Sequence, residues 1–234
     1  MSASAIEPIS FTIYSKDFAR FAQELGASFE RYGFAVLSEY DLPQDRIDAA
    51  ISDTKAFFAL PVETKKQYAG VNGGARGYIP FGVETAKGAT HYDLKEFWHM
   101  GRDLPPGHRF RATMADNVWP AEIPAFKHDV SWLYNALDSM GGKVLEAIAT
   151  YLKLDREFFK PTVENGNSVL RLLHYPPIPQ DATGVIKKGM QAVEWLHQFD
   201  PEAARQDIHG LLGQMLFSGE EGLKPTDALS GGET

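Results

Sequence analysis

The sequence predicts a mixed α/β (α+β) fold in which helices and strands occupy the first part and a short helical segment follows. Through residues 1–185, apolar residues recur at helical spacings of three and four in some stretches and form short strand-like runs in others. After about residue 184 the strand-like runs disappear and only helical spacing remains. We therefore expect two regions, residues 1–185 and residues 186–234.

The composition narrows the class of protein. A chain of 234 residues with 44% hydrophobic residues has enough apolar material for a core, which excludes global disorder. No apolar run approaches the roughly 20 residues of a membrane-spanning helix, and the start lacks the pattern of a secretory signal. The absence of cysteine excludes disulfides and thiolate sites, and a net charge of −8 disfavours nucleic acid. We expect a cytoplasmic protein without nucleic-acid or membrane partners.

The first elements are a helix and a short strand. The helix is predicted to be capped by Ser15 and stopped by Gly33. A buried strand is predicted over residues 34–38. The apolar face of the helix consists of Phe18, Phe21, Ala22, Leu25 and Phe29.

A second helix is predicted from near Pro43 to Leu60, where Pro61 ends it. Residues 71–77 contain three glycines and are predicted to be a loop. Residues 95–100 read as a strand, which a turn at residues 105–107 closes.

The longest predicted element is an amphipathic helix between Pro124 and Leu152, whose apolar positions recur every three or four residues. The pair Gly141-Gly142 inside it suggests that another backbone approaches closely there. A strand over residues 168–175 follows, and Pro176 stops it.

Two helices are predicted after residue 184, where the strand-like runs end. One runs from about residue 186 to residue 199. The other is capped by Asp200, has Pro201 in its first turn and carries an apolar stripe up to residue 216.

Four stretches follow one another in a recognisable order: Gly33-Phe-Ala-Val-Leu37, Arg76-Gly-Tyr-Ile-Pro80, Asp93-Leu-Lys-Glu-Phe97 and Arg171-Leu-Leu-His-Tyr-Pro-Pro177. Through these stretches, residues from about Ile9 to Val185 resemble the isopenicillin N synthase-like family of non-haem Fe(II)/2-oxoglutarate dioxygenases, and among these the ethylene- or succinate-forming enzymes. The resemblance implies a double-stranded β-helix (jelly roll) with helices on one side, here incomplete because most later strands are missing.

The family holds Fe(II) with a His-x-Asp pair and a distant second histidine, and it clamps 2-oxoglutarate with an Arg-x-Ser. The pair should follow Tyr175-Pro-Pro, but no such pair occurs in the residues that follow. We expect this chain to lack the His-x-Asp pair and the Arg-x-Ser, to have no metal site and no catalytic residue, and to bind neither iron nor 2-oxoglutarate. By lineage it is an oxidoreductase on a small organic substrate, inactive as this chain.

A few residues remain as candidates. By the resemblance, Tyr175 and Arg171 sit where family members contact the cosubstrate. The alternative is that Tyr175 is an ordinary tyrosine at a strand end and Arg171 an ordinary strand arginine. We favour this alternative. The residues Asp93, Lys95 and Glu96 are expected to form a structural salt-bridge cluster. An improvised metal triad of His197, Asp200 and His209 is conceivable, but solvated helix faces are the favoured interpretation.

The tail, residues 186–234, resembles an ABC-F ATPase up to its signature, Leu229-Ser-Gly-Gly-Glu233. In an intact ATPase, the residues corresponding to Ser230, Gly231 and Gly232 contact the γ-phosphate of ATP. No Gly-x4-Gly-Lys-Ser/Thr phosphate loop occurs in the chain, so ATP binding is not expected.

Three hypotheses follow from a junction near Val185. The chain is a dioxygenase by lineage without the metal ligands, an ATPase-derived interaction fragment, or a nonfunctional fusion or misassembly. In each case the strand over residues 168–175 has an exposed edge, which favours self-association.

Overall fold

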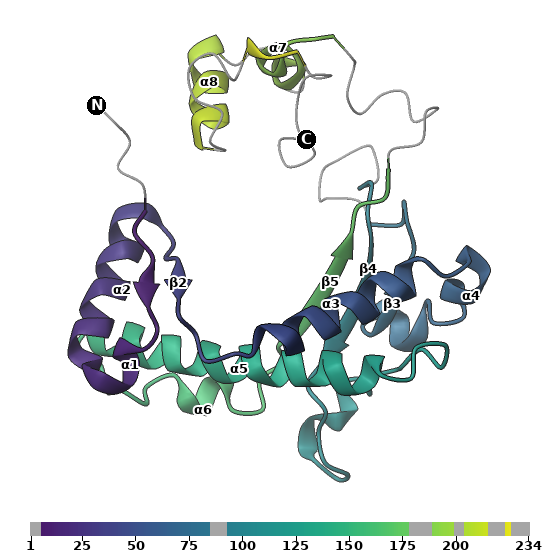
Figure 1. Cartoon of the computed structure of the whole chain (residues 1–234), viewed down its shortest axis with the longest axis horizontal. Coiled ribbons are helices and arrows are strands. Elements are labelled where there is room, and N and C mark those ends of the chain that lie inside the picture. Colours follow the sequence, from purple (N-terminus) through teal and green to yellow (C-terminus); the bar gives the residue numbers. More distant parts are fainter. Residues whose placement is uncertain (1–5, 85–92, 178–188, 199–203, 215–222, 226–234) are drawn as a thin grey trace. The chain divides into compact units, whose positions relative to one another are not determined.

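The computed structural model describes residues 6–84, 93–177, 189–198, 204–214 and 223–225, and it divides into two compact units, Met1–Pro176 and Pro177–Thr234 (Figure 1). Each unit is described by itself. The predicted boundary at residue 185 lies outside the described residues and stays a prediction. Among the described residues, no helix has the length and apolar character needed to cross a bilayer.

The first unit contains most of the regular structure. Its strands are β1 (Ile9–Ser10), β2 (Leu37–Ser38), β3 (Gly77–Ile79), β4 (Glu96–Gly101) and β5 (Val169–His174). Its helices are α1 (Ile13–Lys16), α2 (Phe18–Tyr32), α3 (Gln44–Phe58), α4 (Val62–Lys66), α5 (Phe126–Tyr151) and α6 (Lys160–Val163), with 3-10 turns at Val71–Gly74 and Arg109–Ala112.

The start of α2 corrects the predicted cap. Asp17 is the N-cap, and its carboxylate accepts a hydrogen bond from the backbone N–H of Arg20. Ser15 lies within the separate helix α1 and donates to the backbone carbonyl of Thr12. The predicted stop is confirmed, since Gly33 caps α2 with a φ of 79°, in the left-handed region that glycine enters without strain.

The predicted buried strand over residues 34–38 is shorter and less buried than expected. Only Leu37 and Ser38 form β2, which pairs in parallel with β1. Phe34 and Val36 are exposed. Strand β1 was not predicted, because its two residues are too few for an alternating pattern.

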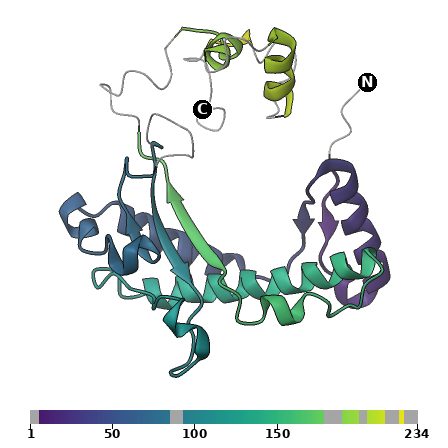
Figure 2. The ribbon, with the colours of Figure 1, turned by 180° about the vertical axis from the view of Figure 1, so that it is seen from behind.

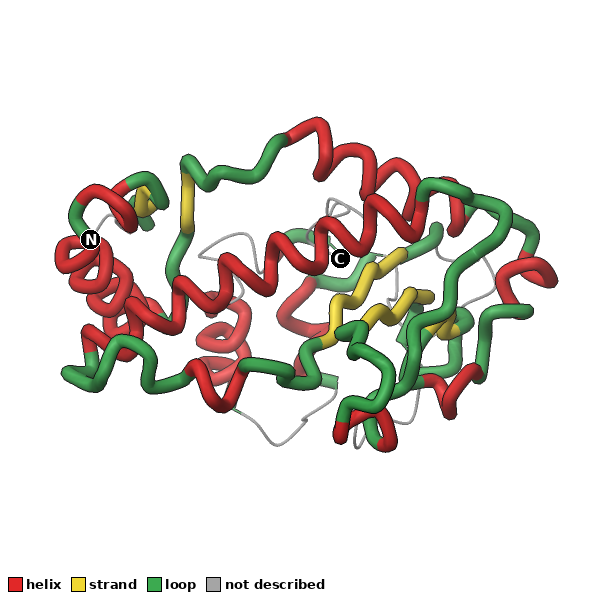
Figure 3. The backbone as a smooth tube through the Cα atoms, turned by 90° about the horizontal axis from the view of Figure 1, so that it is seen from below, coloured by secondary structure: helices red, strands yellow, loops and turns green. Residues whose placement is uncertain are grey.

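Helix α5, the long helix in Figure 3, confirms the long predicted helix. Its two ends contribute residues to two separate hydrophobic cores. At its N-terminal end, Phe126 and Val130 pack with Phe57 of α3 and Trp98 of β4. At its C-terminal end, Ala147 belongs to a second core built mainly by α2 and the chain around β1. The predicted second helix is confirmed as α3, and α4 follows it after Pro61.

The glycine pair in α5 does not mark a close contact. A Cβ placed on Gly141 or Gly142 would meet no atom within 4 Å, so the expected approach of another backbone is wrong. The close approach occurs instead at Gly26 of α2, where a Cβ would overlap the ring of Tyr151 of α5. Gly26 is therefore the position at which the two helices require glycine.

Three antiparallel strands form the main sheet, in the order β3-β4-β5 (Figure 2). The predicted strands over residues 95–100 and 168–175 are confirmed as β4 and β5 within one or two residues. The predicted loop over residues 71–77 ends where β3 begins, at Gly77, so β3 was missed. The complete jelly-roll arrangement stays a prediction.

The second unit has a small helical core. Helix α7 (Ala192–His197) and helix α8 (Arg205–Gln214) bury Val193, Ile208 and Leu212 together. Both helices begin later than predicted, and the proposed cap Asp200 lies outside the described residues.

The contact between α3 and α5 brings two carboxyl groups together, Asp53 and Asp129. Burial first, then the Asp129 charge and a hydrogen bond with that residue, raise the pKa of Asp53, and its Oδ2 atom is buried without a hydrogen-bond partner in the described part of the chain. A raised folded-state pKa contributes stability at low pH that is lost as the pH rises through it. Asp53→Asn should therefore stabilise the protein at pH 7, by about 1 kcal/mol, with no gain at pH 3.

Urea unfolding of Asp53→Asn at several pH values measures this difference. The matched control is Asp48→Asn on the exposed side of the same helix, which should change stability little at any pH. An equal gain for Asp53→Asn at pH 3 and pH 7 would contradict the explanation.

Candidate functional site

The register of the sheet sorts the side chains of β4 and β5 onto two faces. Trp98, Met100, Leu170 and Leu172 pack towards α3 and α5 and form what we call the core face. Their neighbours along each strand point to the opposite side, because side chains alternate. This open face comprises Phe97, His99, Arg171 and Leu173.

Arg171 organises the open face. Its Nε donates to Nε2 of His99 over 2.9 Å, and its Nη1 lies 3.3 Å from a carboxylate oxygen of Glu84. The guanidinium also stands over the ring of Phe97, with 4.4 Å between Cζ and the ring centroid. The predicted residue Arg171 therefore lies in a polar cluster, but two of its nitrogens already have partners.

The acidic partner of Arg171 is shared with a lysine. Lys95 Nζ lies 2.8 Å from Glu84 and 2.7 Å from Asp93. The hydrogen bond from Lys95 is the largest of several causes that hold the pKa of Glu84 below its usual value. The expected cluster is therefore confirmed for Asp93 and Lys95, with Glu84 as the member that the sequence analysis missed.

The surroundings of His99 favour its neutral form. Burial is the main cause that lowers its pKa, and the nearby charges of Arg171 and Arg76 lower it further. A neutral imidazole with its proton on Nδ1 can donate to the carbonyl of Gly74, 3.4 Å away, and accept from Arg171 at Nε2. The cluster thus fixes one tautomer of His99.

Glu96 does not belong to the cluster of Asp93 and Lys95, which corrects the expectation. It points to the core face, where Lys65 Nζ lies 2.8 Å from one carboxylate oxygen and His174 Nδ1 lies 2.7 Å from the other. The hydroxyl of Tyr78 donates to the same carboxylate. Glu96 is the first residue of β4 and faces the core, whereas Lys95 immediately precedes the strand and contacts Glu84 and Asp93.

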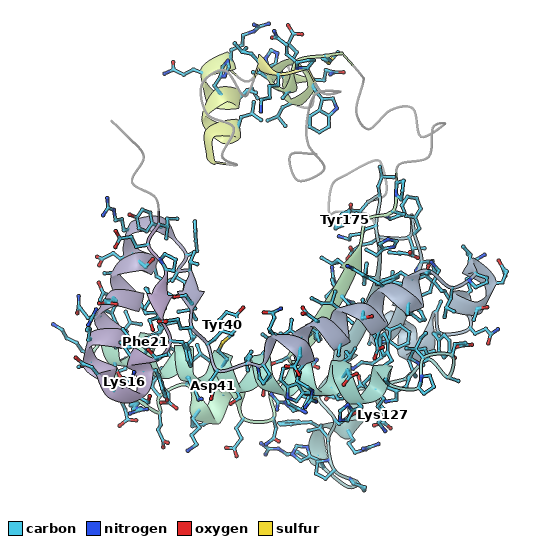
Figure 4. The ribbon with its side chains drawn as sticks, in the orientation of Figure 1. Lys16, Phe21, Tyr40, Asp41, Lys127 and Tyr175 are labelled. Carbon is cyan, nitrogen blue, oxygen red and sulfur yellow. The ribbon has the colours of Figure 1, made fainter. Side chains whose placement is uncertain are left out.

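The second predicted cosubstrate residue, Tyr175, follows the end of β5 (Figure 4). Its side chain is 62% exposed. Among the described residues it makes no hydrogen bond or ring contact with the Arg171 cluster. The structure therefore does not bring Arg171 and Tyr175 together. His99 could have been found from the sequence only with the strand register, because it pairs with Arg171 across 72 positions.

The residues that the structure describes do not form a metal centre. Within the described residues, no group of three or more histidine, aspartate or glutamate side chains is arranged to hold a metal ion. One His-x-Asp spacing does occur, at His91-Tyr92-Asp93, so the expectation that the chain lacks this pair is wrong. That pair precedes β4 rather than following β5, and its Asp93 is engaged by Lys95.

Four of the predicted candidates lie outside the described residues: Asp200, Ser230, Gly231 and Gly232. His91 of the His-x-Asp spacing lies outside them too. His197 ends α7 and His209 lies within α8. Nothing in the described part brings these two histidines into a metal site.

A protein-family model matches part of the first unit. Residues 6–122 match the protein family described as non-haem dioxygenase in morphine synthesis, N-terminal. The 2-oxoglutarate-Fe(II) type oxidoreductase hxnY of Emericella nidulans is 29% identical over 182 residues, which are 74% of this chain and 52% of that protein. The proline hydroxylase buaE of Petromyces alliaceus is 32% identical over 166 residues, 68% of this chain and 50% of that protein.

Two solved structures are also similar to this chain. A 2OG-Fe(II) oxygenase family protein from Caulobacter crescentus is 82% identical with a TM-score of 0.70, over 80% of this chain and 62% of that one. A full-length protein of Neurospora crassa, crystallised in complex with alpha-KG, is 25% identical with a TM-score of 0.61, over 86% of this chain and 59% of that one. The chain spans about half the length of the curated relatives it matches. These comparisons give no support to the resemblance of residues 186–234 to an ATPase.

Proposed function

The chain belongs to the non-haem dioxygenase family, and on this premise we propose that it is an Fe(II)/2-oxoglutarate-dependent oxidoreductase by lineage that binds no iron as this chain. The parent activity is oxidation of a small organic substrate coupled to decarboxylation of 2-oxoglutarate. The relatives support the lineage. The absence of a His-x-Asp pair after Tyr175-Pro-Pro and of any Arg-x-Ser supports the loss of activity.

One observation carries the proposal. The residues after Tyr175-Pro-Pro provide no His-x-Asp pair, and the chain contains no Arg-x-Ser. A non-haem Fe(II) site of this family needs two imidazoles and a carboxylate on one face of the metal. The described residues do not meet that requirement, so no reaction step through iron follows from them.

The open face also fits 2-oxoglutarate poorly. A guanidinium binds a carboxylate through two parallel N–H donors. Arg171 already directs Nε at His99 and Nη1 at Glu84, and the Glu84 carboxylate would repel an incoming dianion. We infer that Arg171 has a structural role here, holding β4 and β5 to the segment that contains Glu84.

The test is reconstitution of the chain with Fe(II), ascorbate and 2-oxoglutarate under air, with succinate release measured. We expect no succinate above a metal-free blank and no Fe(II) retained after gel filtration. A dioxygenase with an intact His-x-Asp pair serves as positive control. Stoichiometric iron together with succinate would overturn the proposal. Titration of Arg171→Gln and Tyr175→Phe with 2-oxoglutarate should give the same result as titration of the original chain.

We further infer that residues 186–234 derive from a different parent, an ABC-F-like ATPase, joined near Val185. The signature-like Leu229-Ser-Gly-Gly-Glu233 and the separate core of the second unit support this. Nucleotide-dependent retention of the chain on an intact ABC-F protein would favour an interaction fragment, and no retention in ATP or ADP would argue for a fusion without that function.

A further inference from the structure

Strand β5 has an unpaired edge within the described residues. β4 is paired on both sides, β3 has a bridge between Tyr78 and Ala69 beyond its pairing with β4, and β1 and β2 have two residues each. Natural edge strands are usually protected by lysine, proline or a bulge. β5 has six residues without proline, and its one charged side chain, Arg171, is turned to the open face.

A groove runs beside this edge on the core face. A cavity of about 460 Å³ lies between α3 and β5. A strand added to the edge would direct every second side chain towards this groove, so those side chains must be apolar. The walls that such side chains would meet include Ile51, Thr54, Phe58, Leu133, Leu172 and His174.

We propose that a second copy of this chain occupies the edge, with the two β5 strands paired antiparallel about a two-fold axis at Leu172. β5 itself has the pattern that the groove requires, with Leu170 and Leu172 on the core face. On the open face, Val169 and Leu173 are 46% and 47% exposed and would gain cover from the pairing. β5 thus offers both the unpaired edge and the complementary side chains.

An axis at the middle of β5 pairs the most residues, which leaves Arg171 and Leu172, and charge decides between these two. Opposite residues of an antiparallel pair point to the same face, so the axis must pass through a residue rather than between two. An axis at Arg171 would set two guanidinium groups directly opposite each other, which is destabilising. An axis at Leu172 sets Arg171 opposite Leu173 of the second copy and Val169 opposite its Tyr175.

Single-cysteine crosslinking tests the register, because the chain has no cysteine of its own. In Leu172→Cys the two sulfurs are carried by directly opposite residues, whose Cα atoms lie about 4.5–5.5 Å apart, within disulfide range. In the matched control Leu173→Cys, the two positions are offset by two residues and lie about 8 Å apart. Oxidation should give a covalent dimer of Leu172→Cys and none of Leu173→Cys.

Charged substitutions at the exposed residue Leu173 test the same pairing and leave the buried residues unchanged. Light scattering should give a mass of twice 26.0 kDa for the unmodified chain. Leu173→Lys should reduce it to the monomer mass, because the lysine faces Arg171 of the second copy, whereas Leu173→Glu should keep the dimer. Val62→Lys, an exposed position on α4, is the control that should not change the mass.

The outcomes separate the alternatives. A monomeric unmodified chain at all concentrations overturns the proposal and indicates that another segment covers the edge. Equal crosslinking at positions 172 and 173, or loss of the dimer in both Leu173→Lys and Leu173→Glu, overturns the register. Circular dichroism of each variant confirms that it is folded, and these tests do not depend on the proposed catalytic lineage.

Discussion

Replacing Lys65 by methionine is expected to destabilise the first unit by about 3–5 kcal/mol, the usual effect of breaking a buried ion pair from one side. The side chains of Lys65 and Glu96 are only 6% and 5% exposed. Lys65 Nζ donates to both oxygens of Glu96 and to the backbone carbonyl of Phe58. Its loss leaves the Glu96 carboxylate buried with only Tyr78 and His174 as partners.

The neighbouring lysine provides a matched control for this experiment. Lys66 pairs with Glu63 on the surface, where both side chains are exposed. Lys66→Met should change the free energy of unfolding by less than about 1 kcal/mol. The double variant Lys65→Met/Glu96→Leu should recover much of the loss, because no charge remains buried. If both lysine variants unfold at the same urea concentration, the buried pair does not stabilise the fold.

We expect the stability of the first unit to depend on pH through the ionisation of Glu96. Burial alone would raise the pKa of Glu96, but hydrogen bonds from Lys65, Tyr78 and His174 outweigh it, so the pKa lies below its usual value. A depressed carboxyl pKa adds stability above the unfolded-state pKa, about 4.3, which is lost as the pH falls through the folded-state value. Stability of the original chain should therefore fall more steeply on acidification than that of Lys65→Met.

Glycine-to-alanine substitutions in two packed helices are expected to have opposite signs. Gly26→Ala should destabilise the protein by about 1–3 kcal/mol, because the new methyl group overlaps the ring of Tyr151. Gly142→Ala should stabilise it by about 0.5–1 kcal/mol, because a Cβ there meets open space and alanine restricts the unfolded chain. Denaturant unfolding of both variants measures the two signs.

A companion variant distinguishes overlap from helix propensity. Tyr151→Ala removes the ring, so adding Gly26→Ala to it should no longer destabilise. A penalty of the same size in that background would show that the methyl group clashes with something other than Tyr151. Gly141→Ala, beside Gly142 and equally open, should repeat the gain.

The sequence predicted the elements whose signal is local. The long helix followed from a repeat of apolar residues every three or four positions, and α5 spans Phe126–Tyr151. Gly33 followed from the need for a residue that accepts a positive φ. The strands β4 and β5 followed from short apolar runs bounded by turn residues.

The rest required contacts between distant residues. The partners of Arg171, at positions 84 and 99, and those of Glu96, at positions 65, 78 and 174, are too distant in the sequence for a local pattern to indicate them. The glycine pair in the sequence did not locate the close contact between helices. It indicated Gly141-Gly142, where a Cβ would meet open space, whereas the contact lies at Gly26. The cap at Asp17 was missed because α1 ends one residue before it.

Helix α5 is a continuous rod of 26 residues whose two ends are embedded in different hydrophobic cores. Because α5 contributes residues to both cores, opening of one core is coupled to the other through the hydrogen-bonded turns in the middle of this helix. Amide protons near Gly141 and Gly142 report on that coupling. If they exchange faster than those at both ends, the two halves of the unit open independently; if they exchange at the common slow rate, the unit unfolds as one.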